Sequence, residues 1–378
     1  MKLKNNKISC CKKTSIGGQA LIEGIMMRGP QKYALAVRNT KGEMIVEIEE
    51  NKASKRPAFF RWPIIRGVFG FIDSMRLGYT CLMRSAELSG LEDLVEESPR
   101  QKKKRLAKEA KLAAQQQETS SEEPHAEEPA EKIAEANESS NESTKPNEKE
   151  EKLPAWAMTL MLIVTFGISI LFAIGLFVFL PTLAYSWLSK AFPALNQNGA
   201  AWNSLWKSAI EGVIKVMLLV GYMASIALMK DIRRTFMYHG AEHKTIFCYE
   251  AGLPLTVENV RAQNRFHPRC GTSFLILMLL VSIFTSFFID PISIAITGSV
   301  LPTLWRVLVK ILLIPIIVGF GYELIKLAGK HDNIFTRIIS APGVWLQHIT
   351  VFEPTDDMIE CAIAAVTPVI PQDGSDKW

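Results

Sequence analysis

The sequence predicts a mainly α-helical membrane protein with four transmembrane helices, a small N-terminal cytoplasmic region that contains a β-hairpin, and an amphipathic interfacial helix. Of the 378 residues 48% are hydrophobic, and they concentrate in four runs, 155–180, 209–229, 272–289 and 311–325. A helix needs about 20 apolar residues to cross a bilayer, and the first three runs approach or pass that length. The fourth does so if it extends back through Arg306 and Lys310, whose long side chains can reach the interface.

The distribution of lysine and arginine predicts how these helices are oriented. Two basic residues lie in the connection 181–208 and none in 297–303, whereas seven lie in 230–271. Because positive charge is enriched on the cytoplasmic side of membrane proteins, both termini and the 230–271 connection are expected in the cytoplasm. Residues 1–13 are basic but lead into no apolar stretch, so they are predicted to be disordered and not a signal peptide.

Residues 14–60 are predicted to form a small β-rich unit. Apolar and polar residues alternate on both sides of residues 39–42, which is the pattern of a β-hairpin. The preceding segment GGQALIEGIMMRGP contains four glycines, which predict tight turns or close backbone approach. Residues 61–95 have apolar residues at helical spacing with arginines between them. This favours an amphipathic helix that lies at the membrane interface or, equally well, covers the hairpin.

The rest of the chain divides by composition. Residues 96–152 contain almost no large apolar side chain, so they cannot offset their ordering entropy and are predicted to be a disordered charged linker. Residues 153–329 form the transmembrane region, and Asp290–Pro291 is expected to end its third helix. Residues 330–378 form a cytoplasmic tail, with an extended segment at Ile349–Phe352 followed by a helix.

The stretch YHGAEHK, residues 238–244, contains the pattern H-x-x-E-H of inverted zincins. The second apolar run has no clear stop before Gly252, so its helix is predicted to continue through this stretch. On that helix His239 and His243 lie one turn apart on one face, the spacing at which two imidazoles can share an ion. Glu242 lies on the same face, where a carboxylate could bind metal or act as a general base.

A catalytic zinc ion normally has three protein ligands. The 230–271 connection offers His267 and Cys270 for the third, directly before the third apolar run, and Glu250 and Glu258 as further candidates. Mixed imidazole and thiolate ligands favour zinc over magnesium or calcium, so the expected cofactor is a divalent metal, zinc. The alternative is that these polar residues are merely solvated at the membrane surface. All six cysteines fall on the predicted cytoplasmic side, where disulfides are rare.

Four motifs carry a resemblance to a known family: GGQALIEGIMMRGP, YHGAEHKTIFCYE, VENVR followed by RFHPRCGTSF, and GYELIK. Together they resemble the YqhQ-like family of bacterial membrane proteins, a family built on a domain of unknown function. The resemblance implies location in the bacterial cytoplasmic (inner) membrane and a metal-dependent enzyme without an established substrate. By motif match it carries over the metal-site residues His239, Glu242, His243, His267 and Cys270.

The sequence therefore predicts a metal-dependent hydrolase that acts on a membrane-proximal substrate, with Glu242 as general base. The alternative is a non-enzymatic scaffold or transport-associated protein in which the metal is a structural clasp. A transporter ranks last, because few polar residues fall within the predicted spans. The lipid bilayer is the expected partner, and no basic motif interleaved with aromatic residues indicates nucleic acid. The sequence does not identify the substrate, and it leaves open whether the protein forms a homo-oligomer.

Overall fold

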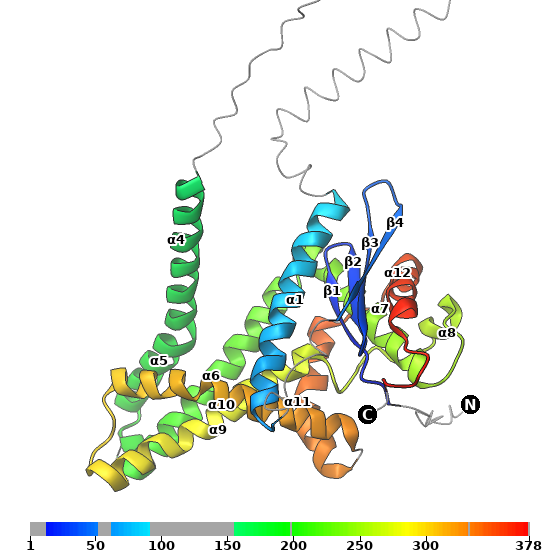
Figure 1. Ribbon diagram of the computed structural model, residues 1–378. Coiled ribbons are helices and arrows are strands. Elements are labelled where there is room, and N and C mark those ends of the chain that lie inside the picture. The colour runs from blue at the N-terminus through cyan, green and yellow to red at the C-terminus, as the bar shows by residue number, and fades with distance from the viewer. Residues whose placement is uncertain (1–12, 52–61, 91–154, 197–198, 332, 377–378) are drawn as a thin grey trace, which may run out of the picture. The chain divides into compact units, whose positions relative to one another are not determined.

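The computed structural model describes residues 13–51, 62–90, 155–196, 199–331 and 333–376 (Figure 1). The chain divides into one unit made of residues up to 92 and from 174 onward, and a second unit, residues 93–173. The segments predicted to be disordered, 1–13 except for Lys13 and 96–152, lie outside the described residues.

Four strands form an antiparallel meander in the order β1-β2-β3-β4: β1 Gly17–Leu21, β2 Gly24–Arg28, β3 Lys32–Arg38 and β4 Met44–Glu50. The predicted hairpin is confirmed as β3–β4, in which Arg38 pairs with Met44. The glycine-rich segment forms a second hairpin, β1–β2, whose two-residue turn places Glu23 at a positive φ of 50°. A side chain at Gly24 would meet the Ala36 carbonyl oxygen at 2.4 Å, so only glycine lets β2 and β3 approach here.

The sheet is covered on both faces (Figure 1). One face, with Ile25 and Met27, packs against α7 (Lys230–Glu250) and α12 (Asp356–Val366) in the larger core. The other face, with Met26 and Leu35, packs against the C-terminal half of α1 (Ile65–Ser89). Alternate residues of each strand thus face opposite cores, as the pleat requires. The predicted amphipathic helix covers the sheet, which was one of its two expected roles.

The N-terminal half of α1 packs against α10 (Thr303–Lys330), the last of the apolar helices. Arg66 forms a two-pronged ion pair with Glu323, and the backbone at Gly67 lies close to Gly319. Arg66 and Glu323 therefore join α1, which covers the sheet, to the apolar helix α10.

Four of the described helical segments are long and apolar enough to cross a membrane: Val164–Ala191, Trp202–Ile226, Gly271–Thr297 and Leu304–Lys330. They correspond to the four predicted transmembrane helices. The first consists of α4 (Ala155–Ile174), the π-helical turn η3 (Gly175–Phe179) and α5 (Leu180–Ala191), and is followed by the short η4 (Pro193–Asn196). The others are α6 (Ala200–Ile226), α9 (Gly271–Thr297) and α10.

The boundaries of three elements differ from the expectation. The second span does not run on: α6 ends at Ile226 and α7 begins after Met229, whose ψ of 130° is extended. Helix α9 continues through Pro291 to Thr297, because membrane helices tolerate proline where neighbours satisfy the freed groups.

The prediction of an extended segment at Ile349–Phe352 is only partly correct. Helix α11 (Ile334–Thr350) fills most of the tail, started by a capping box between Asn333 and Thr336. Extended backbone begins at Val351, and the Phe352 amide then bonds the Phe236 carbonyl of α7. The last elements are α12 and η5 (Thr367–Val369), and α8 (Val257–Arg261) lies in the connection after α7, capped by Thr256 as its sequence suggests.

Candidate metal centre

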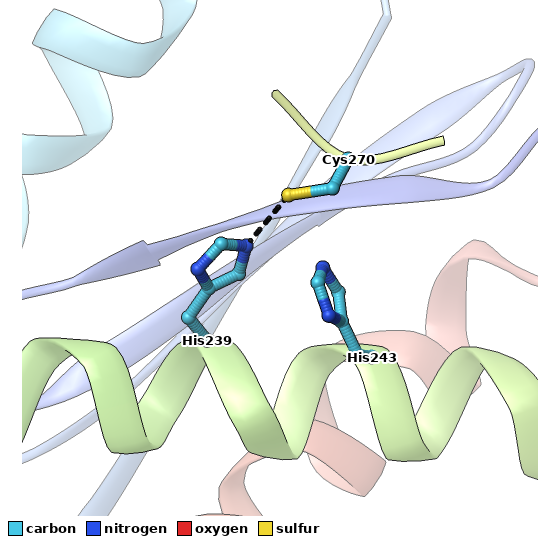
Figure 2. Close-up of side chains that lie close together, drawn as sticks. All are labelled: His239, His243 and Cys270. Carbon is cyan, nitrogen blue, oxygen red and sulfur yellow. Dashed lines mark hydrogen bonds between the residues drawn. The ribbon is translucent and has the colours of Figure 1, made fainter. Parts of the chain in front are cut away.

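Helix α7 presents His239, Glu242 and His243 on one face, beneath β1 and the segment that leads into α9. Glu242 and His243 are buried, and His239 is partly buried. Cys270, the N-cap residue of α9, points down toward both rings (Figure 2). The structure thus brings together residues from two elements that are separated by α8 and its flanking loops.

Backbone carbonyls fix the orientation of both histidine rings. His239 Nδ1 lies 3.1 Å from the Thr350 carbonyl oxygen, and His243 Nδ1 lies 2.6 Å from that of Arg265. A carbonyl can only accept, so each Nδ1 carries a hydrogen, and Nε2 is the nitrogen of each ring that could bind a metal. This carbonyl support is the usual arrangement around metal-binding histidines. The ring nitrogens left free are therefore the ones that face Cys270.

The three candidate ligand atoms converge. His239, His243 and Cys270 each offer one ligand atom, and these three atoms lie within 4.8 Å of one another. His239 Nε2 is 3.0 Å from Cys270 Sγ (Figure 2). Zinc binds imidazole nitrogen at about 2.0 Å and thiolate sulfur at about 2.3 Å, so its ligand atoms stand roughly 3.3–3.8 Å apart. Small side-chain rotations would bring the three atoms to that spacing. This His–His–Cys cluster could bind a metal ion.

The pKa shifts of Cys270 and His239 in the metal-free chain also favour a cation at this position. Burial raises the pKa of the Cys270 thiol, but its interactions with His239 and His243 outweigh burial and hold that pKa well below its usual value. Burial lowers the pKa of His239, yet the neighbouring Cys270 thiolate raises it to about 9. A proton on His239 therefore sits where a cation is favoured, and a bound metal would displace it.

Glu242 lies beside the cluster, and its carboxylate contacts Gly18 of β1. The Gly18 backbone hydrogen-bonds its carboxylate, and a Cβ at Gly18 would come within 2.9 Å of Glu242 Cδ. Burial raises the pKa of Glu242. Its Oε2 atom is buried without a hydrogen-bond partner in the described part of the chain, and the same is true of His243 Nε2. The GGQALIEG hairpin thus positions the candidate base, which the sequence alone did not reveal.

His267 lies next to the cluster but is not one of its three convergent ligands. Its ring is 5.5 Å from that of His243, and both of its nitrogens face N–H groups of Arg269 at 3.3 Å. Burial, with Arg269, lowers the pKa of His267 to about 4, so the ring is neutral. Arg269 in turn pairs with the buried Glu250. The structure therefore places His267 in the wall behind the cluster.

Gln347 of α11 fixes the backbone of this wall. Its Oε1 accepts from the His267 amide at 2.8 Å, and its Nε2 donates to the His267 carbonyl at 2.6 Å and to Ser273 Oγ at 2.9 Å. The side chain is fully buried. One glutamine thus satisfies both backbone groups of the residue that precedes Pro268.

Replacing Gln347 by alanine should lower the free energy of unfolding by about 2–4 kcal/mol, because two buried backbone groups lose their partners at about 1–3 kcal/mol each. Denaturant unfolding of the detergent-solubilised protein, followed by tryptophan fluorescence, measures this. Gln263→Ala is the matched control, since that amide bonds only the Asn259 carbonyl on its own turn. Equal shifts in the two variants would contradict the role assigned to Gln347.

Two cavities meet beside the cluster. The smaller, of about 130 Å³, is lined by Glu242, His243, His267 and Cys270 together with residues 14–18. The larger, of about 410 Å³, lies between the sheet, α1 and Tyr322 of α10. Both are lined by Ser15, Gly17 and Gly18. A molecule in the larger cavity would therefore lie next to both the cluster and a membrane helix.

These features define a class: a membrane protein with four apolar helices and a small β-sheet that covers a buried His–His–Cys cluster. The chain belongs to the family described as "Protein of unknown function (DUF1385)", whose profile matches residues 62–372. It is also 30% identical over 359 residues to a Bacillus subtilis (strain 168) protein named "Uncharacterized protein YqhQ", covering 94% of this chain and 92% of that one. No solved structure matches the chain significantly. The resemblance to the YqhQ-like family is confirmed.

Proposed function

We propose that this protein is a metal-dependent hydrolase of the bacterial cytoplasmic membrane that acts on a membrane-proximal substrate. His239, His243 and Cys270 would hold a divalent ion, zinc, and Glu242 would be the general base. Zinc accepts mixed imidazole and thiolate ligands, and three protein ligands are typical of its catalytic sites. His267 completes the wall and shields the cluster from water.

The observation that carries the proposal is the pair of unsatisfied atoms. Glu242 Oε2 and His243 Nε2 are both buried without hydrogen-bond partners among the described residues, on side chains that line the same cavity. Buried polar atoms are nearly always paired, so such orphans indicate an ion, water or substrate. A purely structural clasp requires the ligands but gives no reason to bury an unsatisfied carboxylate beside them.

The chemistry then assigns each residue a part. When bound, the metal would supply Lewis acidity and favour ionisation of water at neutral pH. Glu242, whose pKa is raised by burial, can hold a proton taken from the attacking water and deliver it to the leaving group. The Gly18 backbone orients the carboxylate, and the Thr350 and Arg265 carbonyls keep the two imidazoles in the ligating tautomer.

The charge of the cluster's surroundings supports a cytoplasmic location. Seven basic residues lie in the segment that holds α7 and the loop before α9, the pattern of the inner side of a membrane. The larger cavity is partly walled by Tyr322 of α10, which favours a substrate at or in the membrane surface.

The second candidate is a scaffold or transport-associated protein with a structural metal. One observation favours it: the three ligands come from α7 and from the N-cap of α9, so an ion would tie the sheet unit to a membrane helix. This reading uses the same ligands but assigns Glu242 no proton transfer.

The test is hydrolysis by the detergent-purified full-length protein, assayed against a peptide library, fatty-acyl esters and phospholipids. Treatment with 1,10-phenanthroline should abolish hydrolysis of one substrate class, and added zinc sulfate should restore it. If zinc rebinds stoichiometrically but no substrate class is hydrolysed, the enzyme proposal is wrong and the structural metal remains as the explanation. Hydrolysis that survives complete removal of metal would overturn the metal mechanism.

A further inference from the structure

The larger of the two cavities, of about 410 Å³, has the size of a small-ligand site. Most of its lining comes from the β1–β2 hairpin and from the middle of α1, between the half of α1 that packs on the sheet and the half that packs on α10. Ser15, Gly17 and Gly18 also line the smaller cavity, as do Glu242 and Cys270. A ligand in the larger cavity therefore lies beside the candidate metal centre.

The register of the β1–β2 hairpin explains why Arg28 lines this cavity. Arg28 pairs with Gly17, and Met26, two residues earlier on the same strand, packs against α1. Because alternate residues of a strand share a face, Arg28 lies on the face of the sheet that α1 covers. Gly17 has no side chain, and a Cβ there would meet nothing within 4 Å. The arginine thus stands across from open space.

Arg28 gives the cavity its charge. Of the described residues that line the cavity, no other is charged, and none is acidic. Arg28 donates to the side-chain oxygen of Asn51, a neutral acceptor, at 3.3 Å. A guanidinium has five N–H donors in a planar fork, and this bond uses one of them. Such a fork matches the oxygens of a carboxylate or a phosphate.

Four neutral hydrogen-bonding side chains line the same cavity, those of Ser15, Gln19, Ser74 and Tyr322. None of the four side chains forms a hydrogen bond with another residue in the described ranges. Polar groups in such a place take their partners from water or from a ligand. An oxyanion held by Arg28 would therefore meet further hydrogen-bonding groups within the same cavity.

The remaining lining is apolar, and one residue comes from a membrane helix. Met26 and Leu77 line the cavity, and Tyr322 belongs to α10, which is long and apolar enough to span a membrane. A charged polar end and an apolar end are the two parts of an amphiphile. The polar end can meet Arg28 while the apolar end contacts Met26 and Leu77.

We propose that this cavity binds a singly charged oxyanion carried by an amphiphile, with Arg28 as its counter-ion. One cation without an acidic neighbour in the described lining matches one negative charge, whereas a phosphate monoester carries about two at neutral pH. Carboxylates and phosphodiesters share this chemistry. Calling the amphiphile the substrate of the metal centre rests on the proposed function, but its binding does not require turnover.

A scintillation proximity assay with tritiated lysophosphatidylglycerol measures this binding on the full-length protein in an uncharged detergent. Unlabelled oleate should displace the label, whereas monoolein, which has the same chain without a charge, should be at least about tenfold less effective. Arg28→Met should weaken lysophosphatidylglycerol binding about ten- to hundredfold, because charged hydrogen bonds are lost. The matched control is Arg84→Met on α1, which removes an exposed arginine that pairs with Glu47 outside the cavity and should bind like the wild type.

Gly17→Leu tests the cavity independently of the charge. A Cβ at Gly17 meets nothing within 4 Å, so leucine can extend into the cavity and should weaken the binding of both lysophosphatidylglycerol and monoolein. Circular dichroism must show that each variant unfolds at the temperature of the wild type. If Arg28→Met does not fold, Gly17→Leu and the comparison of oleate with monoolein decide.

Equal affinity of the wild type and a folded Gly17→Leu protein would overturn the site, and equal affinity of a folded Arg28→Met protein would overturn the counter-ion. Monoolein as effective as oleate would overturn the oxyanion. Acetate as effective as oleate would assign the site to a soluble anion and overturn the amphiphile. Charge-selective binding by a wild type that hydrolyses no substrate would support the site and count against the hydrolase alone.

Discussion

Simultaneous replacement of His239 and His243 by alanine is expected to abolish zinc binding. The purified wild type, with zinc supplied and chelators avoided, should contain close to one zinc per chain by inductively coupled plasma mass spectrometry. The variant should contain almost none, because only Cys270 remains of the three convergent ligands, and one thiolate does not hold zinc against water and buffer.

The control for this experiment is His331→Ala/His348→Ala, which removes the same number of histidines from exposed positions that are not part of the cluster. It should keep the zinc content of the wild type. Circular dichroism must show that both double variants keep their helices, since His243 is buried and its loss leaves a small cavity. A wild type that never binds zinc, or a folded H239A/H243A protein that still does, would refute the metal centre.

The second large effect is expected for Glu242→Gln. Glutamine has the same shape and still accepts the Gly18 backbone hydrogen bond, but it cannot take a proton. The hydrolysis rate should fall by about 10²–10⁴, the usual contribution of a general base, while zinc content and thermal unfolding stay the same. The comparison separates proton transfer from structural support.

Glu258→Gln provides the matched control, because Glu258 is exposed on α8 and belongs to the same connection. Its activity should equal that of the wild type. Undiminished hydrolysis in E242Q would remove Glu242 from the mechanism. A loss of zinc in E242Q would instead make this carboxylate a ligand.

Local signals predicted much of the fold. The alternation around residues 39–42 predicted β3–β4, the apolar runs predicted the four long helices, and the i, i+4 histidines predicted a shared face of α7. The break after Ile226 could not be predicted, because Ala227, Leu228 and Met229 include neither glycine nor proline. Only the packing of α7 against β1 and α12 favours the change of direction there.

The candidates for a third ligand show where sequence reasoning stops. His267 and Cys270 lie close together in the same connection, and spacing alone left both open. The choice depends on long-range contacts, since Gln347 and Arg269 hold His267 in the wall while Cys270 caps α9 with its sulfur toward the rings. Gly18 and Thr350, which support Glu242 and His239, are more than 100 residues from the groups that they contact.

The long apolar helices contain buried charged residues, among them Glu211 on α6 and Asp290 on α9. Glu211 and Lys215 lie inside the run 209–229, whose average hydropathy hides them. Their four-residue spacing with Lys207 was the available signal. A transporter ranked last because few polar residues were expected within the spans, and the burial of Glu211 and Asp290 corrects that premise.

The contact between the two ends of the chain has a consequence for biosynthesis. Thr14 Oγ1 donates to Asp376 at 2.7 Å, across 362 residues, and the same carboxylate accepts from Tyr249 on the last turn of α7. His239 is held by a carbonyl at the end of α11, which the ribosome adds late. It follows that a nascent chain already inserted in the membrane still lacks the support for its first histidine. The His–His–Cys cluster can therefore reach its final geometry only after α11 has been synthesised and packed against α7.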